Sequence, residues 1–280
     1  MNFFNVFQSP NIFEKSPDNI WTNEKLSSFI FQSHFDENIY GGSRNSEFIA
    51  TSIDKIITLA ENYNCKNIID LGCGPGIYTH PLAQFGYNVV GVDISSKSIS
   101  FAQKKAFEEN LNIKYINSDF FNLYKQENQD MVLLLYEIYS TFNLDQRILL
   151  LDNIFKMLNN DGIFILDVPS TNRLSNIEEM SNWTFFNKET LYNSEPFFLF
   201  FKSKIYKDNI LLNHSIFLFE SSSIVNCYDW VQHFNKTSII KELKSAGFKI
   251  LNTYSDISGN ELLQNSMNIA LVCQKNVNNP

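Results

Sequence analysis

The sequence predicts an α/β protein in which a doubly wound parallel sheet is interrupted by an antiparallel insertion. Short apolar runs alternate with longer amphipathic runs between residues 66 and 168, which is typical of strand–helix–strand units. A glycine-rich turn joins the first of these strands to the helix after it. Aromatic, β-prone stretches replace this rhythm between residues 182 and 235. Together these features predict a Rossmann-like, doubly wound, seven-stranded sheet with an N-terminal helical segment and an antiparallel β insertion.

Hydrophobic periodicity and run length predict the core elements. The five strands of the parallel part are expected at Asn67–Leu71, Asn88–Val92, Ile113–Ile116, Met131–Tyr136 and Ile163–Val168. The helices between them are expected at Tyr78–Phe85, Ser98–Glu109 and Asp145–Leu158. The last two strands are almost wholly apolar, which is expected where helices cover both faces of a sheet.

The flanking segments complete the predicted organisation. Residues 1–65 are expected to form an N-terminal helical segment or lid, with an amphipathic helix at Ser46–Tyr63. Residues 66–180 form the core, and residues 181–235 form an antiparallel insertion that serves substrate binding or dimerisation. Residues 236–280 are expected to complete the core sheet with a helix and two strands, at Ser238–Ala246, Lys249–Thr253 and Asn268–Cys273.

The composition of the chain argues against several classes of binding partner. The 280 residues carry a formal net charge of -8 and no basic cluster, so no nucleic-acid partner is expected. The four cysteines are far apart and lack metal-ligand spacing, so neither a disulfide framework nor a metal site is expected. No signal peptide or membrane-spanning run is visible, so the sequence predicts a cytoplasmic protein with no membrane partner.

The sharpest motif lies in IIDLGCGPGIYTHPLAQFGYNVVGVDIS. Glycines at 72, 74 and 76 follow the first strand and precede a helix, so they allow a tight turn and a close approach of backbone N–H groups to a ligand. Asp93 ends the second strand, 17 residues after Gly76, where its carboxylate can accept hydrogen bonds from the two hydroxyls of a ribose. A glycine trio alone would also suit a turn without a ligand. The strand, the helix and the acid together predict an adenosine-type ligand.

The run DLGCGPG resembles motif I of the class I S-adenosylmethionine-dependent methyltransferases. Its G-x-G-x-G spacing differs from the G-x-G-x-x-G of dinucleotide-binding proteins, which must accommodate a pyrophosphate. The resemblance covers residues 66–168 well and residues 236–275 more loosely. It implies S-adenosylmethionine as cofactor, S-adenosylhomocysteine as product, and a cofactor site formed by Asp70, Gly72, Cys73, Gly74, Gly76, Tyr78, Asp93 and Ile94.

Later positions follow the order of the same family. Asp119 closes the third strand, where the family places an acid or amide near the adenine amino group, and Phe120 would lie against the adenine ring. Tyr136 and Glu137 end the fourth strand, the position from which such enzymes face the methyl group and the substrate. Each residue has a structural alternative: Asp119 as a loop cap, Glu137 as a solvated carboxylate, and the rings as packing groups.

The N-terminal segment adds two cofactor-binding candidates, Trp21 and Arg44. Arg44 stands in YGGSRN, at 40–45, and could reach the methionine carboxylate, as N-terminal segments do in similar enzymes. A surface arginine in a turn is the alternative. Two other polar residues receive structural interpretations: Cys73 as a small residue tolerated in the turn, and His80 as a capping or packing group.

Methyl transfer requires few catalytic groups from the protein. A sulfonium methyl group is already electrophilic, so the enzyme must mainly hold the nucleophile in line and exclude water. A general base matters only when the accepting atom arrives protonated. The catalytic candidates are Glu137, Tyr139 and His233, and core packing is the alternative for His233, which stands beside two aromatic residues in CYDWVQHFN.

The expected reaction is methyl transfer to a nitrogen or oxygen nucleophile of a small molecule. An aromatic-lined insertion would suit an apolar or cationic acceptor, and a homodimer is the alternative use of its aromatic strands. Within the enzyme class, a protein or tRNA acceptor stays open, tRNA being disfavoured by the acidic chain. A nicotinamide-dependent oxidoreductase and a non-catalytic S-adenosylmethionine-binding protein are the two rival interpretations.

Overall fold

The computed structural model describes residues 3–36, 43–123, 126–187 and 195–276. Its main body is a seven-stranded sheet in the order β10-β11-β5-β4-β1-β2-β3. The strands are β1 (Asn67–Leu71), β2 (Asn88–Asp93), β3 (Ile113–Asn117), β4 (Gln129–Leu134), β5 (Leu158–Pro169), β10 (Phe248–Tyr254) and β11 (Asn268–Lys275). The five strands from β5 to β3 pair in parallel, whereas β11 pairs antiparallel with both β5 and β10.

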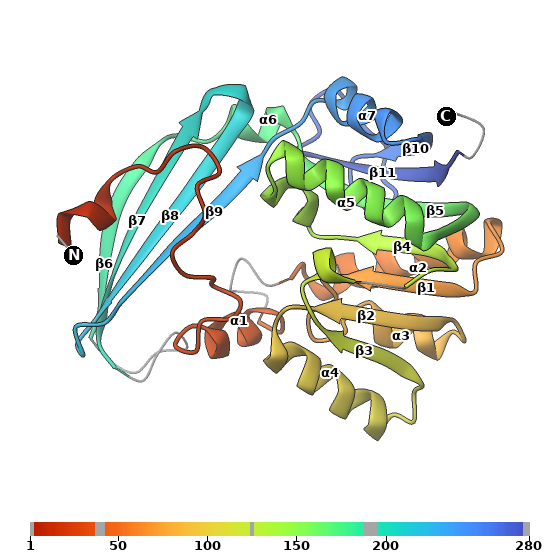
Figure 1. Cartoon of the computed structure of the whole chain (residues 1–280), viewed down its shortest axis with the longest axis horizontal. Coiled ribbons are helices and arrows are strands. Elements are labelled where there is room, and N and C mark those ends of the chain that lie inside the picture. The colour runs from red at the N-terminus through yellow and green to blue at the C-terminus, as the bar shows by residue number, and fades with distance from the viewer. Residues whose placement is uncertain (1–2, 37–42, 124–125, 188–194, 277–280) are drawn as a thin grey trace.

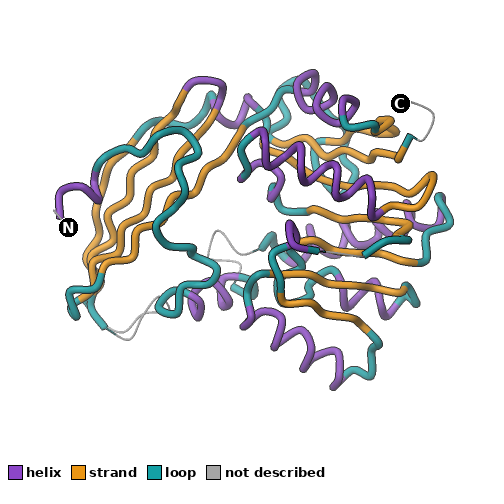
Figure 2. The backbone as a smooth tube through the Cα atoms, in the orientation of Figure 1, coloured by secondary structure: helices purple, strands orange, loops and turns teal. Residues whose placement is uncertain are grey.

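Helices cover both faces of this sheet (Figure 2). The helices of the described residues are α1 (Ser27–Ser33), α2 (Ser46–Asn62), α3 (Thr79–Gln84), α4 (Ser96–Glu108), α5 (Leu144–Met157), α6 (Thr171–Leu174) and α7 (Lys236–Ser245). The apolar stripes of α2 and α3 pack on one face of the sheet, and those of α5 and α7 pack on the other. Burial on both faces explains why the central strands are almost wholly apolar.

A second sheet of four antiparallel strands stands beside the main body, as Figure 1 shows. Its strands are β6 (Met180–Phe186), β7 (Phe197–Tyr206), β8 (Ile210–Phe219) and β9 (Ile224–Gln232). They follow one another in space in the order of the chain. Edge strand β6 carries exposed Met180, Trp183 and Phe185.

The N-terminal segment connects the two sheets. It begins with a 3-10 turn, Phe3–Phe7, and then crosses the second sheet, where Lys202 Nζ donates to Ser9 Oγ at 2.7 Å and Trp230 Nε1 donates to the Glu14 carbonyl at 2.9 Å (Figure 1). It then reaches α4 on the main body, where Phe31 and Phe101 pack with ring centroids 5.1 Å apart. The segment therefore ties the insertion to the edge of the main sheet.

The predicted fold class is confirmed, including the antiparallel insertion and its place after the fifth parallel strand. Predicted element boundaries agree to within a few residues, with one functional exception. β4 ends at Leu134, so Tyr136 lies beyond the strand and not at its end as predicted. The domain boundaries stay a prediction. Among the described residues, no helix has the length and apolar character needed to cross a membrane.

Candidate active site

The glycine turn after β1 is a close-packed backbone bend at the carboxyl end of the sheet. Gly72 and Cys73 both donate backbone hydrogen bonds to the carbonyl of Val92, at 2.8 and 3.0 Å. All three glycines have positive φ angles, 85°, 53° and 89° for Gly72, Gly74 and Gly76. A Cβ atom on Gly76 would lie 2.4 Å from the His80 ring, and one on Gly74 would lie 3.2 Å from the His34 ring. Larger residues would therefore strain the bend and crowd its two neighbouring rings.

Asp93 connects this bend to the end of β2. Its Oδ2 accepts the backbone N–H of Gly74 at 2.9 Å, and its Oδ1 accepts the backbone N–H of Ser95 at 2.7 Å. Burial raises the pKa of the Asp93 carboxyl, although both backbone hydrogen bonds oppose that shift. Each carboxylate oxygen has two acceptor positions, so one on each oxygen remains for hydroxyl donors.

The segment after β4 holds two consecutive residues in the left-handed conformation. Tyr136 and Glu137 have φ angles of 64° and 63°, which side chains with a Cβ rarely adopt. Asp167, near the end of β5, accepts the backbone N–H of Glu137 at 3.2 Å and a further backbone hydrogen bond from Tyr136. Strained backbone of this kind persists only where its surroundings enforce it and is concentrated at functional sites.

Two arginines hold the Glu137 side chain. Arg44 Nη2 lies 2.7 Å from Glu137 Oε1, and Arg173 Nη1 lies 2.7 and 2.8 Å from the two carboxylate oxygens. The Arg44 guanidinium also lies over the Tyr136 ring, 5.1 Å from its centroid. The cluster therefore joins the segment before α2, the turn after β4 and α6. Residues 40–42 of the predicted YGGSRN feature lie outside the described residues.

Two buried carboxyls lie at the same end of the sheet. Burial, with a smaller contribution from Asp93, raises the pKa of Asp70 to about 7. Burial, with a smaller contribution from Glu137, raises the pKa of Asp167 to about 7. Both charges act on the buried Tyr78 hydroxyl, whose pKa is also raised, mainly by its own burial. Asp70 and Tyr78 thus lie where the sequence predicted them, beside the glycine turn.

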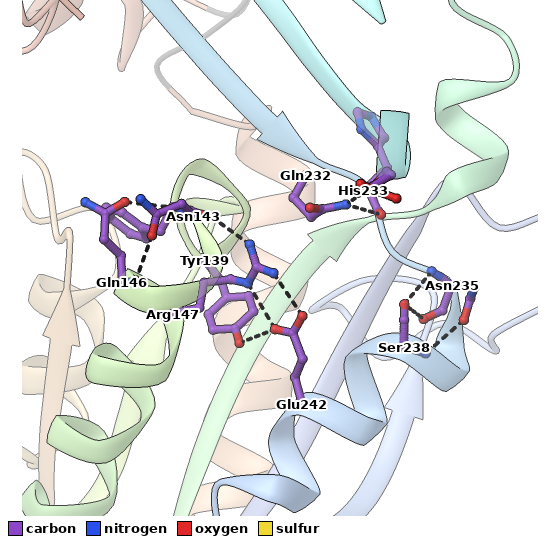
Figure 3. A network of polar contacts seen from close by, with 11 residues as sticks. Tyr139, Asn143, Gln146, Arg147, Gln232, His233, Asn235, Ser238 and Glu242 are labelled. Atoms are coloured by element: carbon purple, nitrogen blue, oxygen red, sulfur yellow. Dashed lines mark hydrogen bonds and ion pairs between the residues drawn. The ribbon is translucent and has the colours of Figure 1, made fainter. Parts of the chain in front are cut away.

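Tyr139 lies in the core and not at the predicted site (Figure 3). Its side chain is fully buried, and its hydroxyl donates to Glu242 Oε2 at 2.8 Å. Arg147 also binds Glu242, through Nε and Nη2 at 3.0 and 2.9 Å. The catalytic assignment of Tyr139 is therefore corrected to a structural one, because a side chain without exposure cannot contact a substrate.

His233 is also buried, at the end of β9 (Figure 3). Its Nδ1 lies 3.3 Å from the Val231 carbonyl. Burial, helped by the positive charge of Arg173, lowers its pKa to about 4, so the ring is neutral at pH 7. The charges of Glu137 and Arg173 both act on the pKa of His233. The catalytic role of His233 stays a prediction.

The other predicted residues divide between the turn region and packing positions. Asp119 caps the 3-10 turn Phe120–Asn122 by accepting the Phe121 N–H at 2.9 Å, so its structural alternative is realised, while its adenine contact stays a prediction. Phe120 packs against Phe142, with centroids 5.8 Å apart. Ile94 and Trp21 are exposed. Burial raises the pKa of the Cys73 thiol, as expected for an unreactive turn residue.

Sequence reasoning missed four residues of this region: His34, Asp167, Arg173 and Asp229. Asp167 carried a usable signal, because an acid stands near the end of an apolar strand, as Asp93 does. The other three carried none, because contacts between distant segments bring them to the site.

We expect Tyr139→Phe to leave catalytic turnover within about threefold of the parent and to lower the free energy of unfolding by about 1–2 kcal/mol. The variant removes one hydrogen bond to Glu242 and leaves the ring packing intact. Turnover and thermal melting measured on the same preparation check this. A loss of turnover beyond about 100-fold with unchanged melting would restore the catalytic role of Tyr139.

Comparison with known proteins finds a domain match in the core. A family model described as a methyltransferase domain matches residues 68–162. The ubiquinone biosynthesis O-methyltransferase of Rickettsia canadensis (strain McKiel) is 32% identical over 114 residues, which are 41% of this chain and 47% of that protein. The match thus spans about half the length of the curated relatives.

Solved structures match over most of the chain. The CcbJ methyltransferase from Streptomyces caelestis superposes with a TM-score of 0.69 at 15% identity, covering 92% of this chain and 99% of that one. The sugar N-methyltransferase KedS8 from Streptoalloteichus sp. ATCC 53650 gives a TM-score of 0.61 at 12% identity, covering 96% and 98%. Both coverages include the insertion as well as the core. Residues 68–162 thus match a methyltransferase domain, and the chain as a whole shares the fold of these solved methyltransferase structures.

Proposed function

We propose that this chain binds S-adenosylmethionine at the carboxyl ends of β1, β2 and β4 and transfers its methyl group to a nitrogen or oxygen atom of a small molecule. One observation carries the proposal: a glycine bend that leaves no room for a Cβ is hydrogen-bonded to an acid that retains free acceptor positions. That combination suits a ligand with a diol, which the ribose of an adenosyl group supplies.

The residues present fit the cofactor in charge as well as in shape. Asp93 would hold the ribose hydroxyls, and the backbone of Gly72–Gly76 would lie against the adenosyl group. Asp70 and Asp167 supply carboxyls near the bend, where an ammonium or sulfonium charge would be stabilised. Asp119 and Phe120 stay our candidates for the adenine edge and ring.

The cofactor supplies an electrophilic methyl group when bound, and the chain supplies position and exclusion of water. Asp167 fixes the strained turn at Tyr136 and Glu137 by accepting backbone hydrogen bonds from both residues. Both Glu137 oxygens receive hydrogen bonds from Arg173, so we assign Glu137 to positioning and not to proton transfer. Asp167, with a pKa near 7, is the better proton acceptor for an acceptor atom that arrives protonated.

The small-molecule class is supported by the second sheet and by two relatives. That sheet adds a wall beside the cofactor end of the main sheet (Figure 1). KedS8 is named as a sugar N-methyltransferase, and the Rickettsia relative as an O-methyltransferase. Nitrogen and oxygen acceptors both remain within the proposal. The cytoplasmic location and the homodimer stay predictions.

The proposed function is tested by calorimetry and turnover together. We expect S-adenosylmethionine and S-adenosylhomocysteine to bind one site per chain, and NADH not to bind. Methyl transfer is then measured over amines, phenols, alcohols, proteins and tRNA. Binding without turnover on any acceptor would favour the non-catalytic interpretation, and binding of NADH alone would favour the oxidoreductase.

We expect cofactor binding to release protons near pH 7. The carboxyls of Asp70 and Asp167, each with its pKa raised to about 7, are partly protonated at this pH. A bound cation favours their ionised forms, so about one proton per cofactor leaves at about pH 6.5 and almost none at about pH 8.5. Calorimetry in two buffers of different ionisation enthalpy measures this release. Proton uptake at pH 6.5 would contradict the assignment, and the uncharged sulfur of S-adenosylhomocysteine should release fewer protons.

A further inference from the structure

The two faces of the second sheet differ in what they contact. One face, the outer face, packs against the first part of the N-terminal segment: Tyr206 OH donates to the Pro10 carbonyl at 2.7 Å, and Phe200 packs on Phe7. Leu26, further along the same segment, packs on the opposite face against Phe217 and Cys227. Cross-strand partners share a face, so the register defines the opposite, inner face. It includes Met180, Asn182, Thr184, Leu199, Phe201, Ser203, Asn213, Ser215, Phe217, Val225, Cys227 and Asp229.

The inner face carries a buried apolar cluster that includes Phe217 and Cys227, and its accessible polar residues lie toward the β6 edge and the β9 edge. Asn182, Thr184 and Asp229 are exposed, and Asn213 is half-buried. The exposed rings Trp183 and Phe185 lie on the outer face, because they alternate with Asn182 and Thr184 along β6. These two rings therefore do not belong to the inner face, and the aromatic-lined acceptor site stays a prediction.

Asp229 is the charged group on this face. Its carboxylate accepts one hydrogen bond, from Asn213 Nδ2 to Oδ2 at 3.2 Å, and within the described ranges it forms no ion pair. Although its side chain is exposed, surrounding protein raises the pKa of the Asp229 carboxyl by desolvation. An anion in such surroundings gains from a cation that reaches it through the accessible side.

β9 brings Asp229 toward the proposed methyl-transfer end. The strand packs against the 3-10 turn Ile138–Thr141, which directly follows Glu137. The backbone after β9 is also fixed to α6, because Thr171 N donates to the Phe234 carbonyl at 2.9 Å. The charges of Glu137 and Arg173 both act on the pKa of the Asp229 carboxyl, so these groups lie in one electrostatic neighbourhood.

We propose that Asp229 and Asn213 form an acceptor subsite that binds the protonated amino group of an amine-bearing small molecule. The inference rests on the proposed function and narrows it from any nitrogen or oxygen acceptor to amines. Asp229 supplies the negative charge, and the Asn213 amide holds the carboxylate in place while leaving Oδ1 for the ligand. Arg173 is held by Glu137, which limits its competition for Asp229.

The test measures binding to the full chain saturated with S-adenosylhomocysteine. Calorimetry compares matched pairs that differ in one group, including glucosamine with glucose and 2-phenylethylamine with 2-phenylethanol. We expect at least one amine to bind about 10- to 100-fold more tightly than its hydroxyl counterpart, and Asp229→Asn to abolish that preference. Glu220→Gln removes an exposed carboxylate near the distant β8–β9 turn and should retain the preference.

A second variant tests the subsite independently, in case Asp229→Asn does not fold. Asn213→Ala keeps the carboxylate but removes its hydrogen-bond donor, so we expect it to reduce the amine preference about threefold. Thermal melting accompanies every variant. An amine preference that survives in Asp229→Asn, or its absence in the parent chain despite S-adenosylhomocysteine binding, would overturn the subsite while leaving the proposed function standing. Failure of S-adenosylhomocysteine to bind would overturn both.

Discussion

Asp93→Ala is expected to weaken S-adenosylmethionine binding about 100-fold, which corresponds to about 2.7 kcal/mol. The carboxylate is the proposed acceptor for two ribose hydroxyls, and it also accepts the Gly74 N–H that fixes the bend. Each hydrogen bond to a charged group contributes about 1.5–3 kcal/mol, so the expected loss corresponds to the lower end of this range for two bonds, about 3 kcal/mol. Calorimetry with S-adenosylhomocysteine, which is not consumed, measures the change.

Asp130→Ala is the matched control for that variant. Asp130 Oδ2 also accepts two backbone N–H groups, from Lys66 and Asn67 at 2.9 Å each, but at the amino end of β1. Its loss should lower stability through the same kind of contact and leave cofactor affinity within about twofold. Equal losses of affinity in the two variants would show that Asp93 acts only through the fold. Unchanged affinity in Asp93→Ala would remove the cofactor site from this position.

Local pattern was enough to predict the first half of the cofactor site. The strand Asn67–Leu71, the glycine bend and Asp93 all lie within one strand–helix–strand unit, whose geometry is set by short connections. The predicted bounds of β1 match the structure, and β2 ends at the acid that the motif singled out. Residues close in sequence and joined by standard turns can therefore be placed without tertiary information.

The second half of the site depends on contacts between distant segments. Glu137 was predicted from its place after β4, yet its two arginine partners come from residue 44 and residue 173. Arg44 is a candidate for binding the methionine carboxylate, which stays a prediction, and in the structure its guanidinium contacts Glu137. The sequence could not distinguish these partners, because a surface arginine has the same local pattern in either case. Asp229 was missed for a related reason, since the inner face is defined only by the register of β8 and β9.

Tyr139 shows how a residue near the site can serve the fold. Three residues before it, the chain forms the strained turn at Tyr136, whereas Tyr139 itself packs against Phe234, which follows β9. Arg147 donates its Nη1 to the Phe142 carbonyl at 2.7 Å and forms a two-pronged pair with Glu242 of α7 (Figure 3). The network thus fixes α5 and α7 to the segment that carries the site. A substitution that destabilises this network is therefore expected to disturb the site through that segment.

Glu242→Ala is expected to lower the free energy of unfolding by about 3 kcal/mol and the melting temperature by about 6–12 °C. The change leaves the Arg147 side chain, which is 5% exposed, without its carboxylate partner and removes the acceptor of the Tyr139 hydroxyl. An uncompensated buried charge costs far more than an exposed pair gains, because water cannot replace the lost partner. Chemical denaturation and thermal melting measure the loss.

The surface pair of α5 provides the matched control for Glu242→Ala. Lys156 and Asp152 form an exposed pair in that helix, with side chains 68% and 51% accessible, so Asp152→Ala should change stability by less than about 0.5 kcal/mol. Equal losses for the two variants would mean that burial of Arg147 contributes nothing to the fold. The combination Arg147→Met with Glu242→Leu should recover much of the lost stability, because it removes both buried charges together. If that double variant melts as low as Glu242→Ala, the loss comes from packing and not from the unpaired guanidinium.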